Sequence, residues 1–233
     1  MIITVDGFTA SGKSTTVRKV ANELHFFYLY TGLLYRGLAY LLMKKESYTL
    51  DLLPQASQEH IDYYLNSSHF SYQYDGKKEE NIIYNNQVIT NDLRTPSSAK
   101  AASLLAFNNN ARKKIEEYEH YLARQHKHII VDSRNAGSVV FPQASCKFFF
   151  TAAQETRAQR WYKDQQEKGI TLSYKDALND IIFRDKRDIL SFDYQEKIKN
   201  EKSSHNKPFI IDTTHFSIQE ITEKLLSIIR PLL

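Results

Sequence analysis

The chain has 233 residues, of which 42% are hydrophobic and 25% are charged, and its formal net charge at pH 7 is +4. This composition excludes a disordered or fibrous chain, and the length suits one sizeable core with a small appendage. A single cysteine, Cys146, excludes an intramolecular disulfide and a cysteine-cluster metal site. No apolar run reaches the roughly 18 residues of a membrane span, and no basic leader follows Met1. We therefore expect a cytoplasmic protein that does not enter a membrane.

Short apolar runs, too short for helices and rich in Ile, Val and Phe, are typical of buried parallel strands. They are Ile2–Asp6, Phe26–Tyr30, His128–Asp132, Lys147–Thr151 and Pro208–Asp212. Helix-period segments separate these runs. The segment from Ser217 to Glu220 predicts a capping box at the start of one helix, and the segment from Ser173 to Asp176 predicts a similar start for another. The helix after Ser173 is predicted to extend through Phe183. The alternation predicts a doubly wound α/β fold with a five-stranded parallel sheet.

Residues 44–96 break this alternation, because they are polar and offer little apolar helix face. The segment from Phe70 to Tyr74 alternates aromatic and polar residues and then meets Asp75-Gly76, a hairpin signal. A second turn at Asn85-Asn86 separates Ile82–Tyr84 from Gln87–Thr90. The pattern predicts a small antiparallel insertion on the α/β core. Phe192–Lys207 is charged and rich in serine and asparagine, and is interpreted as a loop.

The strongest motif follows the first strand, where the sequence from Gly7 to Ser14 matches G-x-x-x-x-G-K-[ST]. In such a loop, backbone N–H groups surround a phosphate at a helix N-terminus. Lys13 would reach the outer phosphates, and Ser14 would ligate Mg²⁺. The predicted nucleotide-binding residues are Gly7, Phe8, Thr9, Ala10, Ser11, Gly12, Lys13, Ser14 and Thr15. The alternative, a glycine turn before an ordinary helix, is disfavoured by the strand before the motif and the helical face after it.

Three further places carry residues suited to phosphate chemistry. Thr31, Tyr35 and Arg36 follow the second strand, and Asp132-Ser133-Arg134-Asn135 follows the third. Arginines bracket a predicted helical hairpin at positions 157, 160, 184 and 187, and the planar guanidinium suits phosphate oxygens. Each has a plainer interpretation: Arg36 and Arg134 as surface ion-pair partners, Arg157 and Arg160 as a solvated helix face, and Asp132 as a cap.

Taken together, these segments resemble the bacterial cytidylate kinase family, along nearly the whole chain. The segments that carry the resemblance are Tyr30–Arg36, Arg94-Thr95, Ala101–Ser103 with Arg112, Asp132–Pro142, Phe148–Ala152 with the arginines that follow, and Asp212–Ile218. The resemblance implies a P-loop NTPase fold in one nucleotide-kinase domain over residues 1–233. Its core would comprise 1–43 and 97–233, its monophosphate-binding insertion 44–96, and its helical lid about 154–192.

The same resemblance implies an activity and a set of site residues. The activity is transfer of the ATP γ-phosphoryl group to CMP or dCMP, with Mg²⁺, by a monomer. The implied catalytic residues are Lys13, Asp132, Arg134, Arg157, Arg160 and Arg184. The implied substrate-binding residues are Thr31, Tyr35, Arg36, Ser103, Arg112, Arg134, Asn135, Arg184 and Asp188, and the metal residue is Ser14.

The chain departs from the family pattern on the acceptor side. Ser133 stands where the family has glycine, Asn135 where it has aspartate, and Ser191 where it has arginine. Two alternatives therefore stay open: a P-loop kinase for another nucleotide or small acceptor, and a weakly active nucleotide-binding regulatory module. A nucleic-acid polymer is not expected as partner, because no basic stripe interleaves with aromatic residues.

Overall fold

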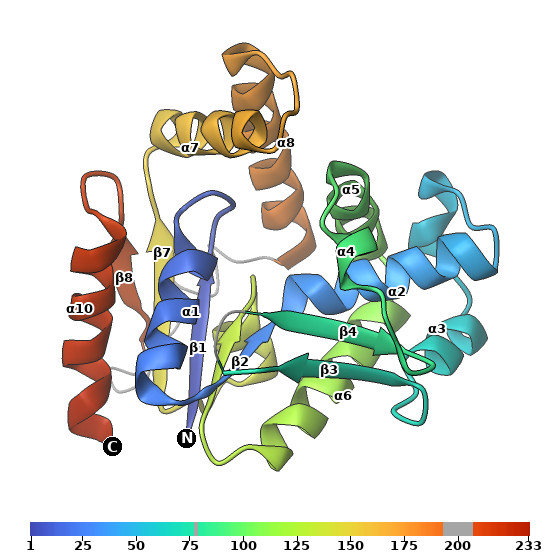
Figure 1. Cartoon of the computed structure of the whole chain (residues 1–233), viewed down its shortest axis with the longest axis horizontal. Coiled ribbons are helices and arrows are strands. Elements are labelled where there is room, and N and C mark those ends of the chain that lie inside the picture. Colours follow the sequence, from blue (N-terminus) through green and yellow to red (C-terminus); the bar gives the residue numbers. More distant parts are fainter. Residues whose placement is uncertain (77–78, 193–206) are drawn as a thin grey trace. The chain divides into compact units, whose positions relative to one another are not determined.

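The structure is a computed structural model that describes residues 1–76, 79–192 and 207–233, except for the side chains of residues 187–192. Five strands form a parallel sheet in the order β2-β6-β1-β7-β8 (Figure 1). The bounds are Ile2–Gly7 for β1, Phe27–Tyr30 for β2, Ile129–Asp132 for β6, Cys146–Thr151 for β7 and Phe209–Asp212 for β8. The predicted α/β sheet is confirmed, with every strand within a residue of its expected bounds. Most of the loop expected at Phe192–Lys207 lies outside the described residues.

The chain divides into two compact units, one comprising residues 1–24 and 132–233 and the other residues 25–131. The first unit holds helices α1 (Lys13–Leu24), α7 (Gln154–Glu167), α8 (Tyr174–Phe192) and α10 (Ile218–Ile229), and the one-turn helices η2 (Ala136–Val140) and η3 (Arg230–Leu232). Helix α1 packs against α10, and each helix buries apolar side chains, among them Val17 and Val20 of α1 and Leu225 of α10. The predicted capping box of α10 is present, because Ser217 Oγ accepts from Glu220 N at 3.3 Å and Ser217 N donates to Glu220 Oε2 at 2.8 Å.

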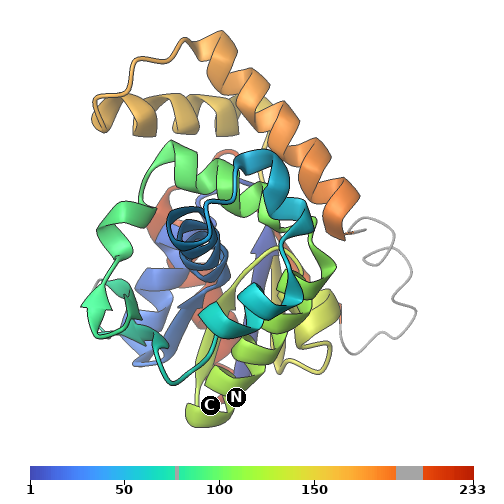
Figure 2. The same cartoon turned by 90° about the vertical axis from the view of Figure 1, so that its right-hand side faces the viewer.

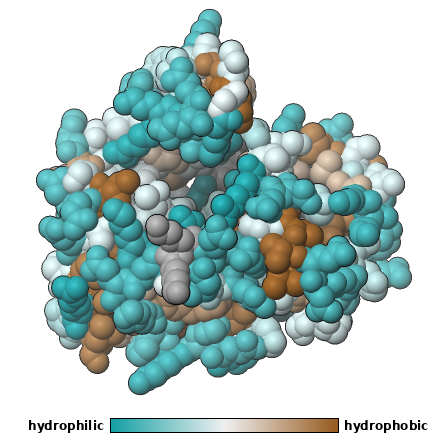
Figure 3. All heavy atoms as spheres, viewed as in Figure 1, coloured by the Kyte–Doolittle hydropathy of each residue, from teal (hydrophilic) through white to brown (hydrophobic). Residues whose placement is uncertain are grey.

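Helices α7 and α8 form a hairpin in the first unit (Figures 1 and 2). Ser173 caps α8 as predicted, accepting from Asp176 N at 3.1 Å. The helix runs to Phe192 rather than ending at Phe183, since neither Gly nor Pro interrupts this stretch. The side chains that α7 buries are Arg157, Ala158 and Gln165, and the face of α7 seen in Figure 3 is mainly hydrophilic. Polar contacts between the two helices include the Arg157–Asp185 pair and the bond from Trp161 Nε1 to Asp180 Oδ2 at 3.2 Å.

The second unit contains the predicted antiparallel insertion as a sheet of order β3-β4-β5. Its elements are α2 (Thr31–Lys45), η1 (Leu50–Gln55), α3 (Gln58–Tyr64), β3 (Phe70–Tyr74), β4 (Glu80–Tyr84), β5 (Gln87–Val88), α4 (Thr90–Leu93), α5 (Pro96–Leu105) and α6 (Asn109–Gln125). Asn85 and Asn86 make the predicted turn, with φ values of +48° and +63°. The strand expected at Gln87–Thr90 is shorter, because Thr90 begins α4 and its hydroxyl accepts from Ile82 N at 2.8 Å.

Among the helices of the described residues, none is long and apolar enough to span a bilayer.

Candidate active site

The loop between β1 and α1 has the backbone that its glycines predict. Gly7 and Gly12 have φ values of +143° and +80°, and Ala10 has φ +59°. A Cβ atom on Gly7 would lie 2.2 Å from Phe150 O, so glycine is required there for close approach as well as for conformation. Phe8 N donates to Phe150 O at 3.3 Å, and Thr16 N donates to Gly12 O at 3.1 Å as α1 begins. The loop thus leads into a helix N-terminus, the local geometry that binds phosphate.

Lys13, the motif lysine, forms an ion pair with Asp132 at the end of β6. The side chain of Lys13 is 4% exposed and that of Asp132 is fully buried. Both residues were expected from the sequence, but their pairing was not. The carboxylate offsets part of the cost of burying the ammonium group beside the loop.

Asp6, at the end of β1, holds the segment that follows Asp132. Its carboxylate oxygens accept from Ala136 N at 2.9 Å and from Gly137 N at 2.8 Å. Burial raises the pKa of Asp6, while these two N–H groups and nearby Lys13 act against that rise. A Cβ atom on Gly137 would lie 2.7 Å from Thr4 Oγ1, which explains the glycine in this turn. The turn η2 is thereby fixed beside the phosphate loop.

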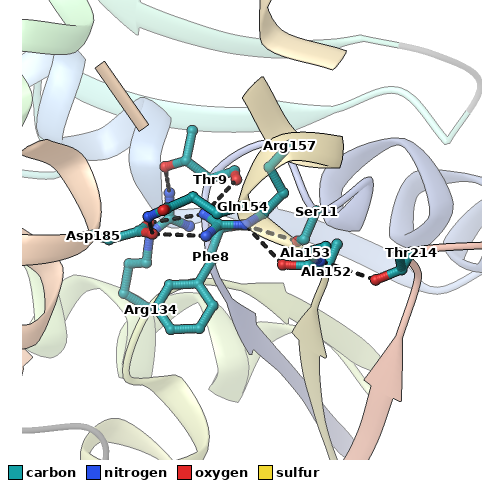
Figure 4. Close-up of polar contacts among 10 residues, drawn as sticks. All are labelled: Phe8, Thr9, Ser11, Arg134, Ala152, Ala153, Gln154, Arg157, Asp185 and Thr214. Atoms are coloured by element: carbon teal, nitrogen blue, oxygen red, sulfur yellow. Dashed lines mark hydrogen bonds and ion pairs between the residues drawn. The ribbon is translucent and has the colours of Figure 1, made fainter. Parts of the chain in front are cut away.

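Arg134 contacts the phosphate loop, and its Nη2 donates to Thr9 Oγ1 at 2.9 Å (Figure 4). Its neighbours Ser133 and Asn135 also interact, since Ser133 Oγ lies 3.4 Å from Asn135 Oδ1. The side chain of Arg134 is partly exposed, as is that of Asn135. The structure therefore brings Arg134, an expected phosphate-binding residue, into contact with the phosphate loop.

The arginines of the hairpin are held by protein groups. Arg157 forms a bidentate pair with Asp185 at 2.8 and 2.7 Å, and it also donates to Ala152 O at 3.1 Å (Figure 4). Its guanidinium group lies 5.0 Å from the centroid of the Phe8 ring. Arg184 stacks on Trp161, at 4.1 Å from the ring centroid.

Arg160 donates to both oxygens of Thr213, at 3.0 Å to Oγ1 and 2.7 Å to the carbonyl. Burial lowers the pKa of Arg160, against the opposing effect of Asp212. Its guanidinium group thus binds the turn that follows β8. The side chain of Asp188, expected to bind substrate, lies outside the described residues.

In the second unit, Thr31 at the start of α2 donates to Glu119 of α6, and both side chains are buried. Burial raises the pKa of Tyr35 strongly, and the nearby carboxylates of Glu119 and Glu116 add to the rise, while Arg112 opposes it. Arg112 donates to Ala106 O at 3.3 Å and to Asn109. The structure therefore brings Thr31, Tyr35 and Arg112 to one cluster around the α6 carboxylates.

The remaining expected residues of this unit are Arg36 on α2 and Ser103 on α5. Arg36 donates to Leu93 O at 3.0 Å, at the end of α4. Ser103 is half-buried on α5. Any phosphate or base contact of Arg36 or Ser103 would therefore come from the helices of residues 25–131.

The donor set near the loop fits a phosphate-bound Mg²⁺ rather than a protein cage. Ser14 offers a half-buried hydroxyl in the first turn of α1, and Asp132 is engaged by Lys13. Within residues 1–76, 79–192 and 207–233, no three His, Cys, Asp or Glu side chains gather as a metal site. Mg²⁺ commonly takes one or two protein oxygens and completes its shell with phosphate and water. A single hydroxyl at this position is consistent with that pattern.

Sequence reasoning missed three residues that organise these clusters: Glu119, Asp185 and Thr213. A signal existed for Glu119, because it lies between Ile115 and Leu122 on the apolar stripe of α6. A carboxylate in such a stripe needs a partner. Thr213 stands in a segment that carries the resemblance, but the contacts of Thr213 and Asp185 depend on how distant segments pack.

Comparison with known proteins places the chain in a family. Residues 3–231 match the family described as cytidylate kinase. A cytidylate kinase of Thermosipho melanesiensis is 32% identical over 228 residues, covering 98% of this chain and 96% of that protein. A cytidylate kinase of Clostridium botulinum is 30% identical, covering 98% and 97%. The crystal structure of an uncharacterized protein from Eubacterium ventriosum shares the fold, with a TM-score of 0.55, 13% identity, and coverage of 99% of this chain and 98% of that one. The chain belongs to the cytidylate kinase family.

Proposed function

We propose that this protein transfers the γ-phosphoryl group of ATP to CMP or dCMP, giving ADP and the nucleoside diphosphate. The observation that carries the proposal is the loop from Gly7 to Ser14, with its buried Lys13–Asp132 pair, in a chain of this family. Phosphoryl transfer requires little covalent chemistry from protein side chains. Catalysis therefore depends on positioning the reactants and neutralising the charge of the phosphates.

On the donor side, the loop N–H groups would bind the triphosphate of ATP, and Lys13 would lie along its outer oxygens. Arg134, already bonded to Thr9, would reach the transferring phosphoryl group, and Arg184 would leave Trp161 to add positive charge. Ser14 would hold Mg²⁺, which when bound neutralises charge on the phosphates. Asp132 keeps Lys13 in place for this task.

On the acceptor side, the proposed residues for the monophosphate and its base are those that the family resemblance implies. They are Thr31, Tyr35, Arg36, Ser103, Arg112, Arg134, Asn135, Arg184 and Asp188. Arginine suits the acceptor phosphate because its fork donates to two oxygens at once.

The organisation proposed for the chain has three parts. A core of residues 1–43 and 97–233 carries the nucleotide loop, residues 44–96 form the monophosphate-binding insertion, and residues from about 154 to 192 form the lid. We further propose that the protein works as a cytoplasmic monomer. The division into these three parts is supported by the family and by the small antiparallel sheet within the insertion.

Product identification tests the reaction. The protein is incubated with Mg²⁺, ATP and CMP or dCMP, and nucleotides are separated by ion-exchange chromatography. We expect ADP and CDP, or dCDP, in equal amounts, and no diphosphate from Lys13→Ala. Formation of ADP without CDP or dCDP would instead show hydrolysis, and would contradict the proposal.

A further inference from the structure

The carbonyl oxygens of the phosphate loop show which side chains hold its shape. A loop that binds phosphate through N–H groups must turn its carbonyl oxygens away from the anion. Ser11 Oγ donates to Phe8 O at 2.8 Å, and Arg157 Nη1 lies 3.4 Å from Thr9 O (Figure 4). Thr213 Oγ1 donates to Ser11 O at 2.8 Å. The last of these bonds ties the loop to a turn more than 200 residues away, which follows β8.

Thr213 is suited to this task by its burial. Its side chain is 0% exposed, so water does not compete for its hydrogen bonds. The hydroxyl has a single proton, and Ser11 O, at 2.8 Å, is a nearer acceptor than Thr151 O at 3.2 Å. A buried hydroxyl at this distance from the carbonyl fixes the peptide that joins Ser11 to Gly12.

Arg160 orients the same hydroxyl. A guanidinium group only donates hydrogen bonds, so the contact from Arg160 Nη1 at 3.0 Å takes a lone pair of Thr213 Oγ1. The proton of the hydroxyl is then directed to the loop. The second contact, from Arg160 Nη2 to Thr213 O at 2.7 Å, holds the backbone of the turn. Donation from a charged group also polarises the hydroxyl and strengthens the bond that it donates.

We propose that Thr213 is a positioning residue for ATP: its hydroxyl holds the Ser11 carbonyl outward, and Arg160 acts through Thr213 rather than on a phosphate. The inference rests on the proposed function in that the loop is taken to bind the triphosphate of ATP. It assigns Arg160, expected from the sequence to be catalytic, to the support of the loop.

The adjacent Thr214 provides a matched control. Its hydroxyl accepts from Ala153 N at 2.9 Å (Figure 4) and donates to Asp212 Oδ1 at 2.6 Å. These bonds hold the turn itself rather than the phosphate loop. Replacing either threonine with valine removes one hydroxyl while keeping the branched shape.

The experiment titrates ATP into the protein without any acceptor, by calorimetry, and compares Thr213→Val, Thr213→Ser and Thr214→Val with the wild type. We expect Thr213→Val to weaken ATP binding by about three- to tenfold, the effect of one hydrogen bond. Thr213→Ser, which keeps the hydroxyl, and Thr214→Val should bind ATP with wild-type affinity. Wild-type affinity in Thr213→Val, or equal weakening in Thr214→Val, would overturn the proposal.

Arg160→Met tests the second half of the proposal, that Arg160 acts through Thr213. It also replaces Thr213→Val as the test variant if the melting temperature of Thr213→Val without nucleotide shows that this variant does not fold. It should weaken ATP binding in the same direction, and the effect should shrink when Thr213 is already valine, because the two residues act in series. Full additivity of the two substitutions, or unchanged ATP affinity in Arg160→Met, would contradict a role through Thr213.

In steady-state assays of Thr213→Val and Arg160→Met, KM for ATP should rise while KM for CMP stays constant. Since titration needs no turnover, a chain that binds ATP but phosphorylates no CMP would refute the proposed function and leave this inference standing.

Discussion

Lys13 and Asp132 form a buried ion pair that joins the first turn of α1 to the end of β6. The pair brings together the two charged residues that the sequence motifs marked separately. Because the partner of Lys13 is a carboxylate, removing the lysine changes both catalysis and stability, and the two effects can be separated.

The first prediction concerns this pair. Lys13→Met should abolish ADP formation and also destabilise the fold by about 3–5 kcal/mol, because the buried Asp132 loses the cation paired with it. The double variant Lys13→Met with Asp132→Asn should regain much of the stability but none of the activity. Urea unfolding and an ADP-release assay measure the two effects. Equal unfolding free energies for the single and double variants would argue against the pair as described.

The second prediction concerns Glu119, which accepts a hydrogen bond from Thr31 in the second unit. Glu119→Ala leaves the buried Thr31 hydroxyl without this acceptor, at a cost of about 1–3 kcal/mol. KM for CMP should rise, since Thr31 is a proposed acceptor-site residue. Glu119→Gln keeps an acceptor oxygen and should stay close to the wild type in KM. If alanine and glutamine have the same effect on KM, the hydrogen bond is not what positions Thr31.

The third prediction concerns pH and the turn that carries Thr213. The hydroxyl and N–H of Thr214 lower the pKa of Asp212 below its ordinary value of 3.8. A carboxyl with a lowered pKa stabilises the fold above its ordinary pKa, and that contribution is lost as pH falls through the lowered value. Asp212→Asn should therefore be slightly less stable than the wild type at neutral pH. The difference should be small because Asp212 is exposed.

Urea unfolding of Asp212→Asn and the wild type at neutral pH and below pH 3.8 measures this difference. The two unfolding curves should approach each other on acidification. A gap that widens at low pH would mean that the charge of Asp212 does not stabilise the turn.

The fourth prediction uses Trp161, the single tryptophan of the chain. Arg184 stacks on its ring, and its indole N–H donates to Asp180 Oδ2 at 3.2 Å. If Arg184 moves to the nucleotide, ATP binding should change the fluorescence of Trp161. Arg184→Ala should change the starting fluorescence and lose most of the response to ATP. Arg230→Ala, on the surface of the same unit, is the control and should respond as the wild type does.

Much of the fold could be predicted because its signals are local. The strands are short apolar runs, the Asn85-Asn86 turn and the Ser217 capping box are fixed by neighbouring residues, and each is found where the sequence places it. The strand was expected to extend to Thr90, which is further than the observed strand. Thr90 instead begins a helix, where its hydroxyl accepts from Ile82 N. This contact is a tertiary one, which periodicity does not reveal.

The sequence predicts which residues form the candidate site better than it predicts the contacts among them. The phosphate loop follows from a spacing that its backbone geometry requires, as the close approach of Gly7 to Phe150 shows. The partners of Arg157 and Arg160 could not be predicted, because an arginine side chain can donate to phosphate, carboxylate or carbonyl oxygens. Which acceptor it meets depends on the packing of α7 against α8 and on the turn after β8.

The loop from Gly7 to Ser14 and its buried Lys13 are proposed to serve phosphoryl transfer to CMP or dCMP. We test this by measuring ADP release from Mg²⁺-ATP with each common ribo- and deoxyribonucleoside monophosphate, with Lys13→Ala as the control. We expect turnover that is selective for CMP and dCMP and that disappears in the variant. Turnover confined to another acceptor would favour a P-loop kinase of different specificity. ATP binding without turnover on any monophosphate would contradict phosphoryl transfer by this site and favour a nucleotide-binding regulatory module.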